Sequence, residues 1–224
     1  MNRTGTLDND IMDEVTAQRH ELTVLLAKLP VQAWDHPSLC AGWHVRHVVA
    51  HMTMPLRYST RRFITEMVKA RGNFDSMADR CARRDGMASP SELINGLRDN
   101  EQNPRTPPGG GLEAALTHDV IHGQDITVAL GIEHLVPPQR LGVVLEAITS
   151  SRSLKHFGVD VDGIELCATD IDWSYGSGAP LSGSAQDLAL VLCGRKLPAG
   201  RLQDPSGRFT LGVSDLGGSS FAQI

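Results

Sequence analysis

Apolar residues recur at the spacing of an α-helix along the first two-thirds of the chain. Over residues 8–29, Ile11, Val15 and several leucines form one stripe between charged positions, which predicts an amphipathic helix ended by Pro30. Ser89-Pro-Ser-Glu92 combines a capping serine, a proline in the first turn and a glutamate three residues after the cap. A helix is therefore expected from there to about residue 102. Others are predicted from about residue 44, over 112–130 and over 138–151.

Two loops and one proline interrupt this helical pattern. Residues 34–43 carry Pro37, Gly42 and two tryptophans that are expected to plug the end of a bundle, and residues 103–111 are rich in proline and glycine. Pro55 falls four residues after His51, where it removes the helical partner of the His51 carbonyl. A kink or break is therefore expected beside His51, with the helix continuing to about Met67. Residues 75–86 are charged and ambiguous.

The apolar pattern changes after Phe157. Residues 164–169 alternate as a strand does, residues 172–176 suit a hairpin partner, and residues 208–213 suit one more strand. Between them, residues 184–192 form a short apolar helical segment. We therefore predict an α+β protein with a helical bundle over residues 1–155 and a small α/β domain over residues 156–224.

Composition narrows the function classes. The 224 residues are 41% hydrophobic and 21% charged, as in a soluble globular protein. A net charge of −5, without a long basic run, and only 4% aromatic residues argue against a nucleic-acid surface. No apolar stretch is long enough to span a bilayer, and residues 1–8 lack the apolar centre of a signal peptide. We expect a cytoplasmic protein, a monomer or homodimer, that binds neither nucleic acid nor membrane.

Histidines provide the main candidate chemistry. His118 and His122 lie four apart in a predicted helix, so they share one face and can hold one cation, and His51 is the natural third ligand. Three imidazoles with a fourth position open are typical of a catalytic metal site. Any single histidine also fits a buried, hydrogen-bonded ring. His47 and His51 are likewise four apart, but His47 falls in a first helical turn, where capping and solvation are ordinary roles.

The four cysteines are scattered, with no Cys-x-x-Cys pair and none beside a histidine motif. In a cytoplasmic chain they are expected to be reduced thiols, and Cys167 and Cys193 to be small core residues. A catalytic cysteine is disfavoured because no activating group lies near any of them in the sequence.

Four segments resemble the mycothiol-dependent maleylpyruvate isomerase family, a branch of the DinB-like metal-binding four-helix bundles. The first runs from Trp34-Asp-His-Pro37 to Cys40-Ala-Gly-Trp43-His-Val-Arg-His-Val-Val-Ala-His51. The second is His118-Asp-Val-Ile-His122-Gly-Gln-Asp125, which looks like the second metal motif of the family. Gly163-Ile-Glu-Leu-Cys-Ala-Thr-Asp170 and Ala185-Gln-Asp-Leu-Ala-Leu-Val-Leu-Cys-Gly-Arg195 resemble its C-terminal α/β domain.

The resemblance implies a DinB-like bundle followed by that small domain, with His51, His118 and His122 as ligands of a divalent metal, zinc in the family. It also implies mycothiol as a low-molecular-weight thiol co-substrate, a small-molecule substrate, and Arg195 as a catalytic arginine. One departure bears on the reaction: His118 stands where the isomerase has a glutamate. The change leaves the site one charge more positive, which favours a thiolate but puts the isomerase reaction itself in question.

Three functions are compatible with these residues. The first is a metal-dependent, mycothiol-using isomerase or S-transferase acting on a small acidic electrophile. In it, Arg195 would grip a substrate carboxylate from the cleft between the two domains. The second is a metal-dependent hydrolase, and the third is a non-catalytic metal- or ligand-binding protein. Arg195 equally suits a structural salt bridge at a helix end.

Overall fold

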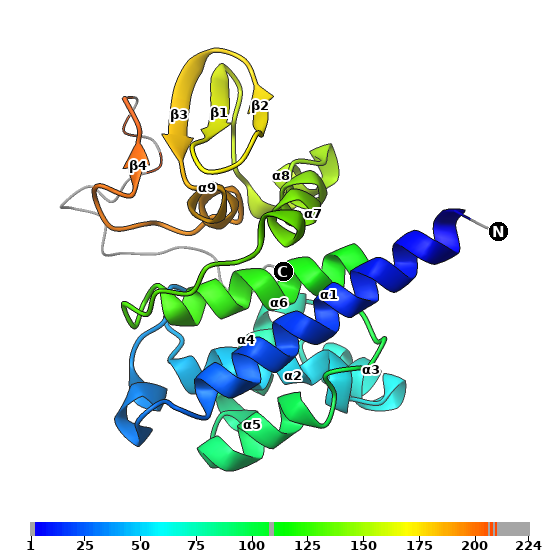
Figure 1. Ribbon diagram of the computed structural model, residues 1–224. Helices are drawn as coiled ribbons and strands as arrows, with labels where there is room; N and C mark the ends of the chain where they lie inside the picture. Colours follow the sequence, from blue (N-terminus) through cyan, green and yellow to red (C-terminus); the bar gives the residue numbers. More distant parts are fainter. Residues whose placement is uncertain (1–2, 108–109, 206, 208, 210–224) are drawn as a thin grey trace. The chain divides into compact units, whose positions relative to one another are not determined.

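The structure, a computed structural model, describes residues 3–107, 110–205, 207 and 209 (Figure 1). Its described part holds α-helices and a small mixed sheet, which confirms the α+β class. Contacts divide the chain into two units, Met1–Glu133 and His134–Ile224. The boundary predicted at 155/156 thus falls within the second unit, because α7 (Pro138–Ile148) packs against α9 (Ala185–Leu192).

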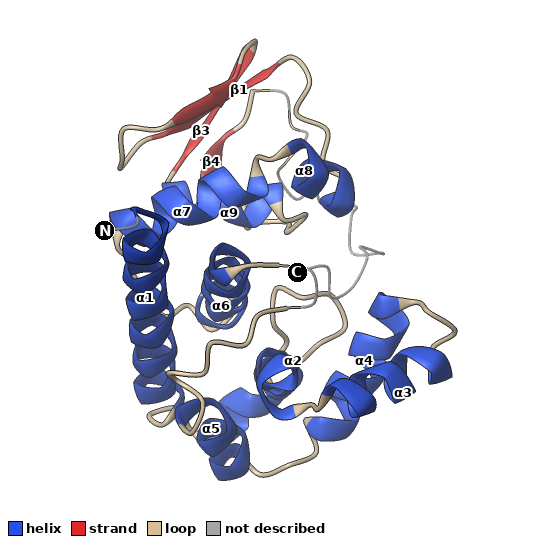
Figure 2. Ribbon diagram, turned by 90° about the vertical axis from the view of Figure 1, so that its right-hand side faces the viewer, coloured by secondary structure: helices blue, strands red, loops and turns tan. Residues whose placement is uncertain are grey.

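Four helices form the bundle of the first unit: α1 (Arg3–Leu26), α2 (Val45–Arg57), α5 (Pro90–Arg98) and α6 (Leu112–Thr127). Helices α1 and α2 each contact both α5 and α6, which closes the bundle. The pair α3 (Thr60–Lys69) and α4 (Phe74–Asp85) packs together, and α4 contacts α2 (Figure 2). The bundle core is made of large apolar side chains that are fully or almost fully buried: Val15, Leu22, Leu26, Trp34, Trp43, Val48, Val49, Met52, Leu97, Leu116 and Ile121.

Helix ends follow the capping residues in the sequence. The Ser89 side chain accepts from the Glu92 backbone N–H at the start of α5, while the Glu92 carboxylate accepts from the Ser89 N–H at 2.8 Å, so the predicted capping box is confirmed. The expectation that the first helix extends to residue 29 was wrong. Helix α1 ends at Leu26, because the chain tightens into i to i+3 hydrogen bonds at Lys28 and Leu29 ahead of Pro30.

The expected continuation of the second helix to Met67 was also wrong. Helix α2 passes through Pro55 and ends at Arg57, and a separate helix, α3, begins at Thr60. Ser59 caps α3 by accepting from the Arg62 N–H, and a residue in a cap conformation cannot continue the preceding helix. The break therefore comes three residues after the proline, and His51 lies in regular helix.

The second unit contains α7, α8 (Ser151–Phe157), α9 and a four-stranded sheet in the order β2-β1-β3-β4. The predicted strand near 164–169 is β1 (Ile164–Ala168), and its hairpin partner is β2 (Ser174–Gly176), which pairs antiparallel to it. Sequence reasoning missed β3 (Ala179–Gly183), which runs parallel to β1, and the short β4 (Leu202–Gln203). The strand expected over 208–213 lies almost entirely outside the described residues.

Tight backbone approach explains one glycine of the sheet. Gly178 has a φ of +133°, and a Cβ there would lie 2.1 Å from the Gly163 carbonyl oxygen. Only glycine fits this position, where the chain turns into β3. Within the described residues, no helix has the length and apolar character needed to cross a membrane.

Candidate metal centre

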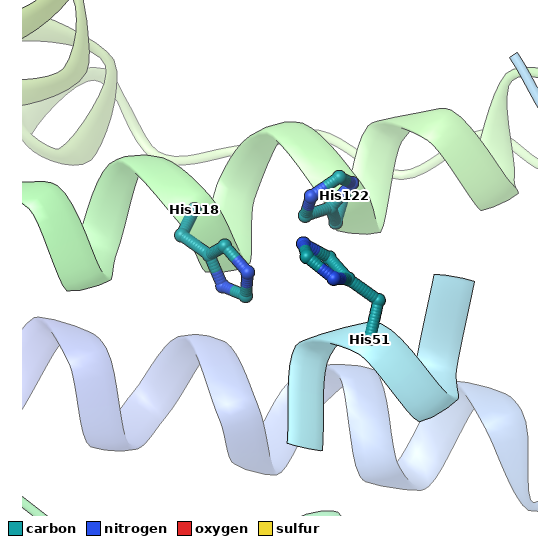
Figure 3. Close-up of side chains that lie close together, drawn as sticks. All are labelled: His51, His118 and His122. Carbon is teal, nitrogen blue, oxygen red and sulfur yellow. The ribbon is translucent and has the colours of Figure 1, made fainter. Parts of the chain in front are cut away.

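Two helices of the bundle bring His51, His118 and His122 together. Figure 3 shows the rings of His118 and His122 leaving α6 on one face, and the ring of His51 reaching them from α2. Each residue offers a ring nitrogen, and these three nitrogens lie within 4.8 Å of one another. The ring centroids are 4.8–5.2 Å apart, and all three residues are at most 3% exposed. The grouping predicted from the sequence is therefore present in the fold.

The cluster fits a small divalent cation. Three atoms no more than 4.8 Å apart have a common point within about 2.8 Å of each, so modest ring rotation reaches a Zn–N length of about 2.0–2.1 Å. The His118 Nε2 atom is buried and has no hydrogen-bond partner among the described residues. A buried polar nitrogen without a partner is costly in a finished core, whereas a metal bond would satisfy it.

A carboxylate fixes the orientation of His118. The Nδ1 atom of His118 lies 3.0 Å from Asp119 Oδ1, and the other oxygen of Asp119 accepts from Arg19 Nε at 2.6 Å. Burial alone would raise the pKa of Asp119, but the hydrogen bond to His118 and the Arg19 charge hold that pKa below its ordinary value. The ionised carboxylate keeps the proton of His118 on Nδ1, so the Nε2 lone pair faces the cluster.

A second carboxylate does the same for His122. Asp125 Oδ2 lies 2.9 Å from His122 Nδ1 and accepts from the Cys40 thiol at 2.9 Å. The Cys40 sulfur is also 3.7 Å from His122 Nδ1. The expectation that no cysteine lies near a histidine motif thus holds along the sequence but not in space, where the loop before α2 folds against α6 through the Leu39 N–H and the Asp125 carbonyl.

Sequence reasoning missed these supporting residues, although part of the signal was present. Asp119 directly follows His118, and Asp125 lies three residues after His122, on the same helical face. Arg19 carries no such signal, because it lies on α1, 100 positions from its partner. The site is therefore held by α1 and the loop before α2 as well as by the two helices that bear the histidines.

The other histidine pair forms a helix cap. His44 is the N-cap residue of α2, and its backbone N–H donates to His47 Nδ1 at 3.1 Å. The two rings stack with centroids 5.3 Å apart. Burial, followed by the charges of His44 and Arg83, lowers the pKa of His47 below its ordinary value. His47 is thus committed to the end of its helix, the ordinary role that its position indicated.

The chain is similar to proteins of known family and fold. Residues 15–103 match the model of the mycothiol maleylpyruvate isomerase N-terminal domain. This segment is similar to that domain. The match confirms the family resemblance noted in the sequence, and it covers His51 but not the α6 histidines.

Similarity beyond that segment is more distant. The chain is 24% identical to the uncharacterized proteins Rv0036c and MT0041 of two Mycobacterium tuberculosis strains, over 82% of this chain and 84% of theirs. The crystal structure of the mycothiol-dependent maleylpyruvate isomerase superimposes with a TM-score of 0.59 at 14% identity, over 84% of this chain and 89% of that one. A histidine-to-alanine mutant of the same enzyme gives a TM-score of 0.56 at 12% identity. These structures share the fold.

Arg195, the candidate for a catalytic arginine, lies in the second unit just after α9. Its Nη1 atom donates to the Cys193 carbonyl at 2.7 Å, and the residue is partly exposed. The contact holds the side chain near its own helix end, as expected for an arginine beside the negative end of a helix dipole. Its role in catalysis stays a prediction.

Proposed function

We propose that this protein is a zinc-dependent, mycothiol-using isomerase or S-transferase that acts on a small acidic electrophile. The convergence of three buried imidazoles, two of them oriented by carboxylates, is the observation that carries the proposal. The match of residues 15–103 to the isomerase N-terminal domain and the fold shared with the isomerase support the choice of thiol and reaction class.

His51, His118 and His122 would hold the metal, since three neutral imidazoles suit zinc and leave a coordination position open. When bound, such a cation lowers the pKa of a coordinated thiol and so supplies a thiolate at neutral pH. Asp119 and Asp125 keep the Nδ1 protons in place, so that the Nε2 atoms act as ligands. Trp43, which is 1% exposed, packs beside His51 with ring centroids 5.1 Å apart.

Two reactions of such a thiolate fit the proposal. The thiolate can add to the activated double bond of the substrate, allow rotation about the resulting single bond, and leave again, which is cis–trans isomerisation with the thiol regenerated. It can instead displace a leaving group, which is S-transfer. In either case we propose that Arg195 binds a substrate carboxylate through its planar guanidinium, a contact that lysine cannot reproduce.

Metal analysis followed by a thiol-dependent assay tests this function. The protein, purified and reconstituted with zinc, should hold one ion per chain, bind mycothiol in a titration, and convert maleylpyruvate or a related unsaturated acid only when both are present. Arg195→Ala should lower kcat/KM with metal content unchanged, and Arg195→Lys should restore little of it. Hydrolysis with metal alone would identify a hydrolase, metal binding without turnover a non-catalytic protein, and absence of bound zinc would overturn the proposal.

A further inference from the structure

A pocket of about 290 Å³ opens in the first unit where α2 ends and α3 begins. Its apolar wall is formed by Met54, Pro55 and Phe63, and its polar side includes Arg105 and Thr106 from the segment between α5 and α6. Met54 and Phe63 also belong to or pack on the apolar cluster that joins α2, α3 and α4. The wall is thus part of a packed core, which gives the pocket a defined shape.

The pocket and the histidine cluster share one face of α2. Met54 and Pro55 lie three and four residues after His51, and residues at these spacings are stacked on the same side of a helix. One helical turn rises about 5.4 Å. A small molecule in the pocket therefore lies about one turn along α2 from His51.

Among the described residues that line this pocket, Arg105 is the one cation. It is held in place because its Nη1 atom donates to the Tyr58 carbonyl at 2.9 Å. A guanidinium has five N–H groups, so several donors remain after this bond. No carboxylate pairs with Arg105 in the part of the chain that the structure describes.

The neighbouring arginines and lysine form ion pairs with carboxylates. Asp85 forms ion pairs with Arg57, Arg62 and Arg84. Buried Glu66 does the same with Lys69, Arg80 and Arg84. Because those carboxylates are already surrounded, they leave the charge of Arg105 uncompensated. None of these ion pairs includes Arg105.

We propose that this pocket binds a small organic acid, with its apolar body against Met54 and Phe63 and its carboxylate on Arg105. Pockets of this kind, mostly apolar with one anchored charged group, are typical of sites for small organic ligands, and a guanidinium grips a carboxylate with two parallel bonds. The further statement that this acid is the substrate of the metal centre rests on the proposed function, and it requires a substrate with a second carboxylate for Arg195. The binding itself does not rest on that function.

Methionine methyl NMR tests the pocket directly. In protein labelled at the methionine methyl groups, sorbate, an unsaturated carboxylate, should shift the Met54 signal in a saturable manner. Arg105→Ala should weaken sorbate about tenfold or more, as expected for loss of a charge-assisted contact. Arg61→Ala removes another exposed positive charge, from α3 and outside the pocket, and should change the affinity less than about twofold. Sorbyl alcohol, the neutral counterpart, should bind wild type as weakly as sorbate binds Arg105→Ala.

The outcomes separate the pocket from the metal chemistry. A Met54 signal that does not respond, equal effects of the two arginine variants, or equal affinity for acid and alcohol would each overturn the pocket. The remaining methionine signals show whether Arg105→Ala keeps its fold. Titration with and without zinc completes the design. A Met54 response in a protein that lacks thiol-dependent turnover would remove the proposed function and leave the pocket, whereas turnover without a Met54 response would do the reverse.

Discussion

Two histidine pairs on helices of the same bundle make different hydrogen bonds. His44 and His47 stack at the first turn of α2, where a backbone N–H donates to one ring. His118 and His122 lie in the middle of α6, are at most 3% exposed, and have their Nδ1 atoms against carboxylates. The difference teaches that helical spacing alone does not make a candidate metal site. At His118 and His122 a carboxylate lies at Nδ1 and favours Nε2 as the ligand atom, whereas at His47 a backbone N–H occupies the Nδ1 lone pair.

Replacing one histidine of each pair should show the difference between the two pairs most clearly in the zinc affinity. His122→Ala is expected to weaken zinc binding by more than about 100-fold, because loss of a ligand exceeds the effect of losing a supporting carboxylate. His47→Ala should leave the affinity within about twofold, because His47 is a cap. Competition with a chromophoric chelator measures both. A large loss in His47→Ala would instead favour His47 and His51 as the metal pair.

The buried ion pair between Arg19 and Asp119 should contribute strongly to the free energy of unfolding. Arg19→Met leaves the carboxylate of Asp119 buried without its counter-charge, and such a change costs about 3–5 kcal/mol. Arg83→Met, which breaks a surface pair with Asp79 on α4, should cost no more than about 1 kcal/mol. Urea unfolding of the metal-free protein gives both values. Adding Asp119→Asn to Arg19→Met should recover part of the loss, and equal costs for the two single variants would contradict this role of Arg19.

The carboxylate on His122 should have an intermediate effect on metal affinity. Asp125→Asn keeps the shape of the side chain but removes the charge that orients the imidazole, so zinc binding should weaken by about 10- to 100-fold. Asp99→Asn, at the exposed C-terminal end of α5, serves as the control for loss of one negative charge. Unchanged affinity in Asp125→Asn would show that the orientation of His122 does not depend on this carboxylate.

The smallest expected effect is the pH dependence caused by His47. Its pKa in the folded protein lies below the unfolded value of about 6.5, so protons bind the unfolded chain more readily. The stability that results is fully present above that value and is lost as the pH falls through the lowered folded pKa. In His47→Gln, where glutamine can still accept the cap hydrogen bond, unfolding measured at about pH 7.5 and about pH 5.5 should differ less than in wild type. His36→Gln, at an exposed position, should leave the difference unchanged.

Local signals in the sequence predicted more of the fold than long-range ones. Ser89 and Glu92 predicted α5, and Gly163 with the alternating apolar residues after it predicted β1. Both signals involve only residues that are neighbours in the sequence. Strand β3 was missed since Ala179-Pro-Leu-Ser-Gly183 has little β propensity and is a strand only through its pairing with β1. Its conformation is determined by partners distant in sequence.

The same distinction applies to the site. His118 and His122 were predicted from their spacing, and His51 from its place on another apolar segment. Arg19 and Cys40 could not be found in this way, because each reaches α6 from a distant segment and only packing brings it there. The assignment of Arg195 to catalysis depends on the family resemblance alone and stays a prediction.

The position of the three histidines on two helices has a consequence for the resistance of the protein to proteolysis. His51 and the α6 pair are separated by everything from residue 58 to residue 111, so a cation shared among them is a cross-link between distant parts of the chain. A ligand that binds only the folded state adds about 2.7 kcal/mol at a free concentration one hundred times its Kd. If the proposed zinc is bound, proteases that attack opened chains should degrade the metal-free protein faster than the zinc-bound protein.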